Sequence, residues 1–470
     1  MKTNVKNVAT PVYTHEGGKA SLHVKPIDQL RRSVLSCLLW EDEFYESGAS
    51  IGDRIKSLVA VCDVADVAAL AIEAREDMKL RHAPLLLVRE LARRKHAGAI
   101  VGKTLTRVIQ RADELAEFLS IYWKDGKEQP IAKQVKLGLA GAFRKFDEYQ
   151  FAKYDRESAV RLRDALFLSH ARPKDAERHY TKNERAAERK LHAMPKLSAG
   201  EALYRKITDR TLATPDTWEV ALSGGADKKE VFERLLTENK LGYMALLRNL
   251  RNMADAGVDV ALVQDKLLAG AAKSKALPFR FVAAARAVPQ WEEMIDTAMQ
   301  LAMGGLPKMP GRTILLVDVS GSMDQKLSSK SDLTRLDAAS ALAVLLRGVC
   351  ENVRVFTFSQ NVVEVPARTG MALIDAIKIS QTHGGTYLGA AVNAVNTGLT
   401  YDRLITITDE QSYDIVGAPL ARGYMINVAS AEHGVGYGQW TKIDGFSESI
   451  VRYIQSMEEA SHHNPFQCEL

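Results

Sequence analysis

Three short polar segments carry residue types that could bind a metal ion. Asp318, Ser320 and Ser322 form an Asp-x-Ser-x-Ser sequence, and alternate residues of an extended backbone point to one side. Thr386 follows a Gly-Gly pair, and Asp409 follows the run Leu-Ile-Thr-Ile-Thr. Oxygen ligands suit Mg²⁺, which binds them octahedrally and usually keeps some waters. The sequence therefore predicts Mg²⁺, or another hard divalent cation, bound by Ser320, Ser322 and Thr386, with Asp318 and Asp409 bound directly or through water.

These segments follow apolar runs that must position them. Residues 314–317 are apolar and include β-branched Ile314 and Val317, which is typical of a strand buried on both faces of a parallel sheet, and 404–408 are similar. Their polar ends then lie at the carboxyl edge of the sheet, where open α/β folds bind ligands. A remaining alternative is that Asp318 and Ser320 only cap a helix or form a turn. Further strands are expected at 353–358, 362–365 and 424–429, and helices at 336–350, 371–380, 388–395 and 448–459.

The longer first part of the chain has a different pattern. From about residue 30 to 288, apolar residues return at three- and four-residue spacing, and prolines and glycines divide the run. Many short helices in series are typical of stacked helical pairs, as in HEAT-like solenoids. We therefore expect a multi-domain chain with an N-terminal arm (1–30), an all-α helical-repeat module (31–306) and a doubly wound α/β domain (311–470).

Composition excludes several protein classes. The chain has 470 residues, of which 46% are hydrophobic and 26% charged, as in ordinary globular proteins. No apolar run reaches membrane-spanning length, and the first residues lack the apolar core of a signal peptide, so no membrane association is expected. The four cysteines are far apart and form no CxxC pair, which argues against disulfides or zinc. A cytoplasmic protein is therefore expected.

The net charge of +5 hides an asymmetry. Residues 311–470 hold 12 basic and 17 acidic side chains, whereas 1–310 hold 51 and 41. The most basic stretch is 131–190, with 15 basic against 9 acidic side chains. Cations with interspersed aromatics can hold phosphates and stack bases, although interleaved acids also fit a solvated helix face. The candidate RNA-binding residues are Lys133, Lys136, Arg144, Lys145, Lys153, Arg161, Arg163, His170, Arg172 and Lys174.

Several of these motifs resemble those of one known family. The five oxygen ligands match the metal-ion-dependent adhesion site of the von Willebrand factor A (vWA) domain. Trp218-Glu219 and the block 241–250, LGYMALLRNL, precede it, as in the Ro autoantigen (Ro ribonucleoprotein) family. Residues 168–173, LSHARP, resemble that family's Leu-Ser-His-x-x-Pro segment, which contacts Y RNA. The chain is therefore identified as a member of this family, with a bacterial or phage origin expected.

This resemblance implies a fold and a function. In the family, a TROVE module forms a ring of HEAT-like helices before the vWA domain. Small noncoding Y RNAs bind outside the ring, and single-stranded 3′ ends of defective RNAs enter its cavity. The family acts in RNA quality control or processing, is not known as an enzyme, and in bacteria partners an exoribonuclease. A monomeric, non-enzymatic RNA-binding scaffold is therefore expected.

Two alternatives stay open. One is a metal-dependent adhesion or assembly protein whose helical half binds protein only. The basic stretch 131–190 favours the RNA-binding scaffold over this alternative. The other is a metal-dependent hydrolase, which the lack of a second acidic metal cluster weakens.

Overall fold

The computed structural model describes most of the chain, with gaps. Residues 1–24 of the predicted arm, residues 177–190 of the basic stretch and the last eight residues lie outside it. The chain divides into two compact units, Val59–Gly224 and Met1–Leu58 with Gly225–Leu470. These units differ from the domain bounds expected from the sequence, which stay a prediction. The described residues are 25–35, 48–124, 130–155, 158–176, 197–274, 276–327, 331–429, 433–435, 438–445 and 450–462.

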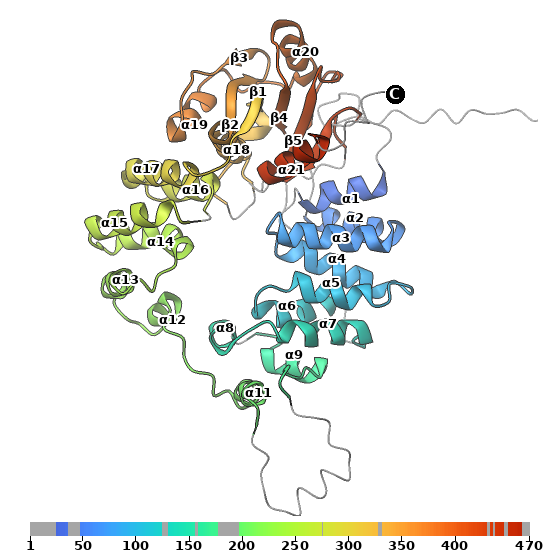
Figure 1. Cartoon of the computed structure of the whole chain (residues 1–470), viewed down its shortest axis with the longest axis vertical. Helices are drawn as coiled ribbons and strands as arrows, with labels where there is room; N and C mark the ends of the chain where they lie inside the picture. The colour runs from blue at the N-terminus through green and yellow to red at the C-terminus, as the bar shows by residue number, and fades with distance from the viewer. Residues whose placement is uncertain are drawn as a thin grey trace, which may run out of the picture. The chain divides into compact units, whose positions relative to one another are not determined.

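The described part of Val59–Gly224 is helical. α3 packs on α5, α5 on α7 and α7 on α9, while α4 packs on α6, so the helices stack in two layers (Figure 1). This stack confirms the helical series expected from the 3.6-residue periodicity. The helices are α3 (Val64–Glu76), α4 (His82–Arg93), α5 (Ile100–Val108), α6 (Asp113–Tyr122), α7 (Lys133–Phe143), α8 (Glu148–Tyr154), α9 (Leu162–Ser169), α11 (Ala199–Asp209) and α12 (Trp218–Ser223).

Local sequence explains how these helices begin and how closely they pack. The Asp63 side chain accepts a hydrogen bond from the Ala65 N–H at 2.7 Å and so caps α3. α5 and α7 approach closely because Gly138 has no side chain: a Cβ there would lie 2.8 Å from the Leu105 Cβ. The Thr106 hydroxyl donates to the Gly138 carbonyl at 3.0 Å across this contact.

The second unit is built from two parts of the chain, one before and one after the residues of the unit Val59–Gly224. α14 packs on α15 and α16, and α16 packs on α18 of the α/β domain. Leu246, Leu250 and Met253 are buried on α14 as their spacing predicts, while Arg248 and Arg251 are exposed. Its helices before the sheet are α1 (Pro26–Leu35), α13 (Lys228–Thr237), α14 (Tyr243–Asp255), α15 (Val260–Ala271), α16 (Pro278–Ala287) and α17 (Glu292–Met303); α2 (Gly48–Val61) spans the boundary between the units.

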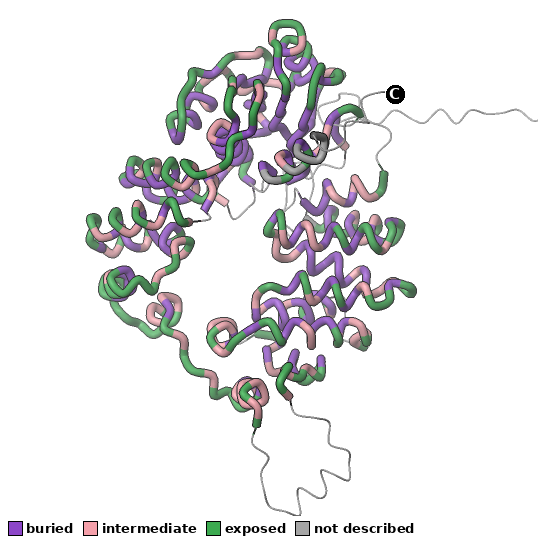
Figure 2. Tube along the Cα trace, viewed as in Figure 1, coloured by how far each residue is buried: buried purple, intermediate pink, exposed green. Residues whose placement is uncertain are grey.

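The α/β domain is built on a six-stranded sheet of order β3-β2-β1-β4-β5-β6. All neighbours are parallel except β2 and β3, so β1 and β4 lie side by side in the middle. Strand residues are largely buried, and α18 is buried at nearly every position, whereas α20 alternates buried and exposed positions (Figure 2). The strands are β1 (Met309–Asp318), β2 (Cys350–Phe358), β3 (Val362–Glu364), β4 (Arg403–Thr408), β5 (Arg422–Asn427) and β6 (Thr441–Asp444).

Helices cover this sheet. α20 joins one core cluster with Ile314 and Leu316, while α18 packs against β1 and β2 outside that cluster. The doubly wound fold and most predicted elements are confirmed, but β6 was not predicted. In the described part of the chain, no helix is long and apolar enough to cross a membrane. The helices are α18 (Arg335–Val349), α19 (Gly370–Lys378), α20 (Leu388–Gly398) and α21 (Ile450–His462), and Gly321–Asp324 form a 3-10 turn.

Candidate metal centre and candidate RNA-binding face

The predicted metal ligands come from three loops at the carboxyl edge of the sheet. Asp318 ends β1, and Asp409 follows β4, the parallel neighbour of β1. The Gly321 N–H donates to the Gly384 carbonyl at 3.0 Å, which ties the serine loop to the loop that carries Thr386. The fold therefore brings all three predicted segments to one place, as expected from strands that end at a common edge.

All five predicted ligands are buried, including Thr386. The Ser320 and Ser322 hydroxyl oxygens lie 3.3 Å apart. Asp318 Oδ1 accepts from the Ser320 N–H at 2.8 Å, and its Oδ2 accepts from the Thr408 hydroxyl at 2.6 Å. These contacts hold the Asp318 carboxylate in one orientation beside the two serine hydroxyls.

The electrostatics of this cluster favour a cation. Burial raises the pKa of Asp318 well above its usual range, and the charge of Asp409 raises it further, while hydrogen bonds from Ser320 and Thr408 oppose the rise. Arg335 Nη1 lies 3.5 Å from Asp409 Oδ2 and places one positive charge beside the pair. Two buried carboxylates with three hydroxyls form an oxygen-only donor set, which suits a hard divalent cation. Among described residues, no group of three or more His, Cys, Asp or Glu forms a metal cluster.

Two residues of this candidate centre, Thr408 and Arg335, were not predicted from the sequence. Thr408 precedes Asp409, and its hydroxyl orients Asp318, so the alternation of β4 could have identified it. Arg335 starts α18, and its place beside Asp409 depends on the fold alone. His383, in the loop before Thr386, bonds Asp324 through Nδ1 at 2.7 Å.

The candidate RNA-binding residues all lie in the unit Val59–Gly224. Those on α7 and α9 are brought together because the two helices pack on each other. The Arg144 side chain donates to the Arg172 carbonyl at 2.8 Å and so joins the ends of these helices. His170 ends α9 in the left-handed region, with φ 54°. All of the candidates are exposed or partly exposed, namely Lys133, Lys136, Arg144, Lys145, Lys153, Arg161, Arg163, His170, Arg172 and Lys174.

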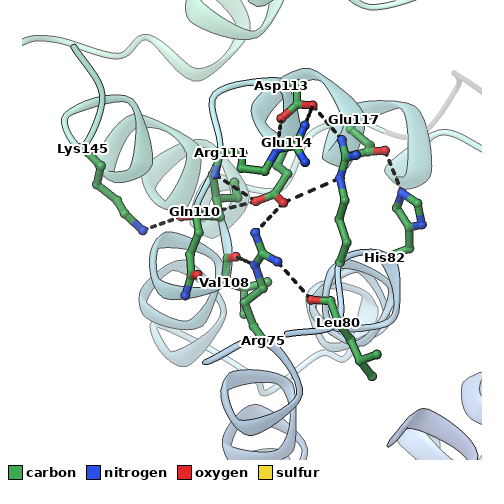
Figure 3. A network of polar contacts seen from close by, with 12 residues as sticks. Arg75, Leu80, His82, Val108, Gln110, Arg111, Asp113, Glu114, Glu117 and Lys145 are labelled. Carbon is green, nitrogen blue, oxygen red and sulfur yellow. Dashed lines mark hydrogen bonds and ion pairs between the residues drawn. The ribbon is translucent and has the colours of Figure 1, made fainter. Parts of the chain in front are cut away.

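Lys145 differs from the other candidates because its ammonium group has internal partners. It donates to the Thr106 carbonyl at 2.8 Å and to the Ile109 carbonyl at the end of α5. Burial lowers the pKa of this ammonium group. Figure 3 shows it pointing toward the turn between α5 and α6. These contacts give Lys145 a structural role at the end of α5. A contact between Lys145 and RNA stays a prediction.

A network of buried ion pairs and hydrogen bonds lies in the same unit as the candidate RNA-binding residues (Figure 3). Arg75 on α3 donates to Glu114 on α6 at 2.5 Å and to the Val108 carbonyl at 2.9 Å. Glu114 also accepts from the N–H groups of Gln110 and Arg111, at 2.8 and 3.1 Å. The network thus fixes the turn between α5 and α6 against α3. The sequence does not predict this network, because ion pairs between separate helices leave no local sequence pattern.

Comparison with known proteins agrees with this two-part organisation. Residues 209–303 match the family model of the TROVE domain, and residues 312–420 match that of the Ro60 vWA domain. The chain thus matches the models of these two domains one after the other. The family expectation from the sequence motifs is therefore confirmed. The matched ranges include the helical block 243–255 and all five predicted metal ligands.

Individual relatives match to different extents. Telomerase protein component 1 of Mus musculus is 35% identical over 89 residues, which cover 18% of this chain and 3% of that protein. The chain thus spans only a small part of that relative. The crystal structure of the Deinococcus radiodurans Ro (RSR) protein matches with a TM-score of 0.59 and 18% identity, covering 93% of this chain and 100% of that one. At this identity, the likeness supports the fold.

Proposed function

We propose that this Ro-family chain is a non-catalytic RNA-binding scaffold that binds a Y-like small noncoding RNA. The observation that carries the proposal is the packed pair α7 and α9, whose ends present exposed Arg144, Arg172 and Lys174. Lys and Arg contact phosphates, which position RNA without reading its sequence. The match to the TROVE domain, which begins at residue 209 in the same unit and continues into the other, is consistent with this role.

An aromatic side chain gives this face a way to hold bases. Phe167 on α9 is 59% exposed, three residues before His170. Unpaired bases stack on exposed aromatic rings, and a histidine can donate a hydrogen bond or stack. We propose that Phe167 and His170 contact unpaired bases while the surrounding cations contact phosphates.

Further parts of the proposal rest on the family resemblance. They are binding of single-stranded 3′ ends of defective RNA, a role in RNA quality control or processing, partnership with an exoribonuclease, a monomeric state and a cytoplasmic location. The exposed cations of α7–α9 support RNA binding in general, and the noncoding-RNA class also rests on the family resemblance.

We also propose that Mg²⁺ binds at the carboxyl edge of the sheet. Ser320, Ser322 and Thr386 would supply hydroxyl ligands, with Asp318 and Asp409 direct or through water. The support is the oxygen-only donor set and the mutual repulsion of two buried carboxylates. When bound, the ion would neutralise these carboxylates and offer a coordination position to an acidic group of a partner.

A filter-binding series in rising salt tests the RNA proposal. Arg163→Ala/Lys174→Ala should weaken binding of a structured noncoding RNA, and each lost phosphate contact should flatten the salt dependence by about 0.9. The matched control is Lys228→Ala/Lys229→Ala, which removes the same charge from exposed positions of α13 in the other unit. The control should keep the wild-type affinity and slope. Equal behaviour of both double variants and the wild type would place the RNA site elsewhere.

One observation favours the second candidate function, a metal-dependent adhesion or assembly protein. Tyr387 and Tyr413 flank the loop of Thr386, with ring centroids 5.6 Å apart, and are 41% and 49% exposed. Exposed aromatic side chains are enriched at protein interfaces. If the wild type binds no noncoding RNA below about 100 mM salt, where phosphate contacts are strong, this function replaces RNA binding.

A further inference from the structure

A buried ion pair joins the N-terminal helix to the loop that carries Asp409. Arg32 Nη1 on α1 lies 2.9 Å from Glu410 Oε2, and both side chains are fully buried. α1 packs on β6, where Lys442 Nζ donates to the Asp28 carbonyl at 3.3 Å. All these residues belong to one compact unit. The N-terminal helix is thus part of the environment of the α/β domain's carboxyl edge.

Glu410 is held in an unusual backbone conformation next to the candidate metal ligands. Its φ is +57°, in the left-handed region that residues with a Cβ rarely adopt. Its N–H donates to the Thr408 hydroxyl at 3.1 Å, and that hydroxyl donates to Asp318 Oδ2 at 2.6 Å. Asp409 Oδ1 accepts from the Gln411 N–H at 3.2 Å. The conformation at Glu410 therefore sets the orientation of both candidate carboxylate ligands.

The space around the ion pair is fitted to it. A Cβ on Gly434 would lie 2.4 Å from Arg32 Nη2 and 2.6 Å from Glu410 Oε2, so only glycine leaves room for the pair. Asp444 lies in the same cluster: burial raises its pKa, while Lys442 and Arg32 oppose the rise. Arg32 therefore compensates more than one buried carboxylate, and its loss would leave Glu410 without this positive charge in a dry site.

We propose that Arg32 is a positioning residue of the metal centre, so that docking of α1 and binding of Mg²⁺ strengthen each other. This inference rests on the proposed Mg²⁺ site. Arg32 holds Glu410, Glu410 fixes the turn after β4, and the turn orients Asp409 and the Thr408 hydroxyl that holds Asp318. Because coupling between two binding events is reciprocal, an occupied metal centre should in turn hold α1 more firmly. α1 passes this restraint to α2 through the bond from Arg54 Nε to the Ser33 hydroxyl, 2.9 Å long.

Calorimetric titration of the full-length chain with Mg²⁺ tests the inference. Arg32→Met should weaken Mg²⁺ binding about tenfold, the usual effect of losing a partner outside the ligand shell. Arg403→Met is the matched control, because Arg403 forms a largely buried pair with Glu458, with Nε to Oε1 at 2.6 Å, at the opposite end of β4. The control should lower stability yet keep the wild-type Mg²⁺ affinity.

A second variant and a second measurement separate positioning from folding. If circular dichroism shows that Arg32→Met is unfolded, Glu410→Gln removes the same pair from the other side and should weaken Mg²⁺ binding similarly. In the wild type, Mg²⁺ should also slow hydrogen exchange of the α1 amides, an effect that a merely structural ion pair would not give.

The outcomes distinguish this inference from the metal proposal itself. No Mg²⁺ binding by the wild type would contradict the metal centre. Mg²⁺ binding by the wild type with an unchanged affinity in the folded Arg32 or Glu410 variant would contradict the positioning role alone. An equal loss of affinity in Arg403→Met, or α1 exchange that ignores Mg²⁺, would also contradict it.

Discussion

At the scale of single residues, the proposed metal centre depends on carboxylates that are costly to bury. Asp318 and Asp409 are both fully buried, and burial first, then the charge of Asp409, raises the pKa of Asp318. Hydrogen bonds from Ser320 and Thr408 and the charge of Arg335 offset part of this cost. A divalent cation would offset the rest, and this gives the site a physical reason to bind one.

Replacing one carboxylate should remove metal binding without unfolding the chain. In Asp318→Ala, Mg²⁺ should no longer bind or raise the melting temperature, because a ligand and the carboxylate that accepts from Ser320 and Thr408 are both lost. The matched control is Asp324→Ala, a neighbouring acid that is half exposed and pairs with His383. Thermal unfolding with and without Mg²⁺ provides the measurement. A wild-type Mg²⁺ response in Asp318→Ala would remove this residue from the site.

At the scale of elements, the ion pairs between helices differ in how much they contribute to stability. Glu114 on α6 is fully buried against Arg75 on α3, whereas Glu76 on α3 meets Arg107 on α5 at the surface. A buried charge left without its partner destabilises strongly, while exposed pairs contribute little. The buried pair should therefore govern the stability of the stack that carries the candidate RNA-binding face.

This difference can be measured by urea unfolding. Glu114→Gln should lower the free energy of unfolding by about 3 kcal/mol, because the Arg75 guanidinium stays buried without its carboxylate. Glu76→Gln removes the same charge from the exposed pair and should cost less than about 1 kcal/mol. The helical circular dichroism signal follows both. Similar small losses in the two variants would mean that the network does not hold the α3–α6 stack.

The elements also show why sequence reasoning succeeded in some places and not in others. Residues 314–317 were predicted as a buried strand because four consecutive apolar residues leave few alternatives. β6, with the sequence Thr-Lys-Ile-Asp, was missed because it is short and three of its four residues are polar. Arg335 and Arg32 approach the metal centre only through folding, so their types and positions carry no local signal. Short motifs with a fixed spacing could be predicted; long-range charge partners could not.

At the scale of the whole molecule, the chain combines two kinds of surface. The unit Val59–Gly224 presents exposed cations and Phe167 on α7–α9, and the other unit contains the oxygen-lined edge of the sheet. The TROVE match, residues 209–303, lies mostly in that second unit, and the Ro60 vWA match, residues 312–420, lies wholly in it. This arrangement fits a scaffold that holds RNA through one surface and responds to a metal ion at another.

Ultraviolet cross-linking of the full-length chain to a structured noncoding RNA, with the linked residues mapped by mass spectrometry, tests the central claim most directly. Stacked aromatic residues and bases are close enough to cross-link, so the RNA should be linked within residues 133–174, with Phe167 or His170 among the sites. Phe167→Leu should lose its own cross-link while the purified protein keeps its helical signal. No cross-link in this range, or cross-links confined to residues 311–470, would contradict the account.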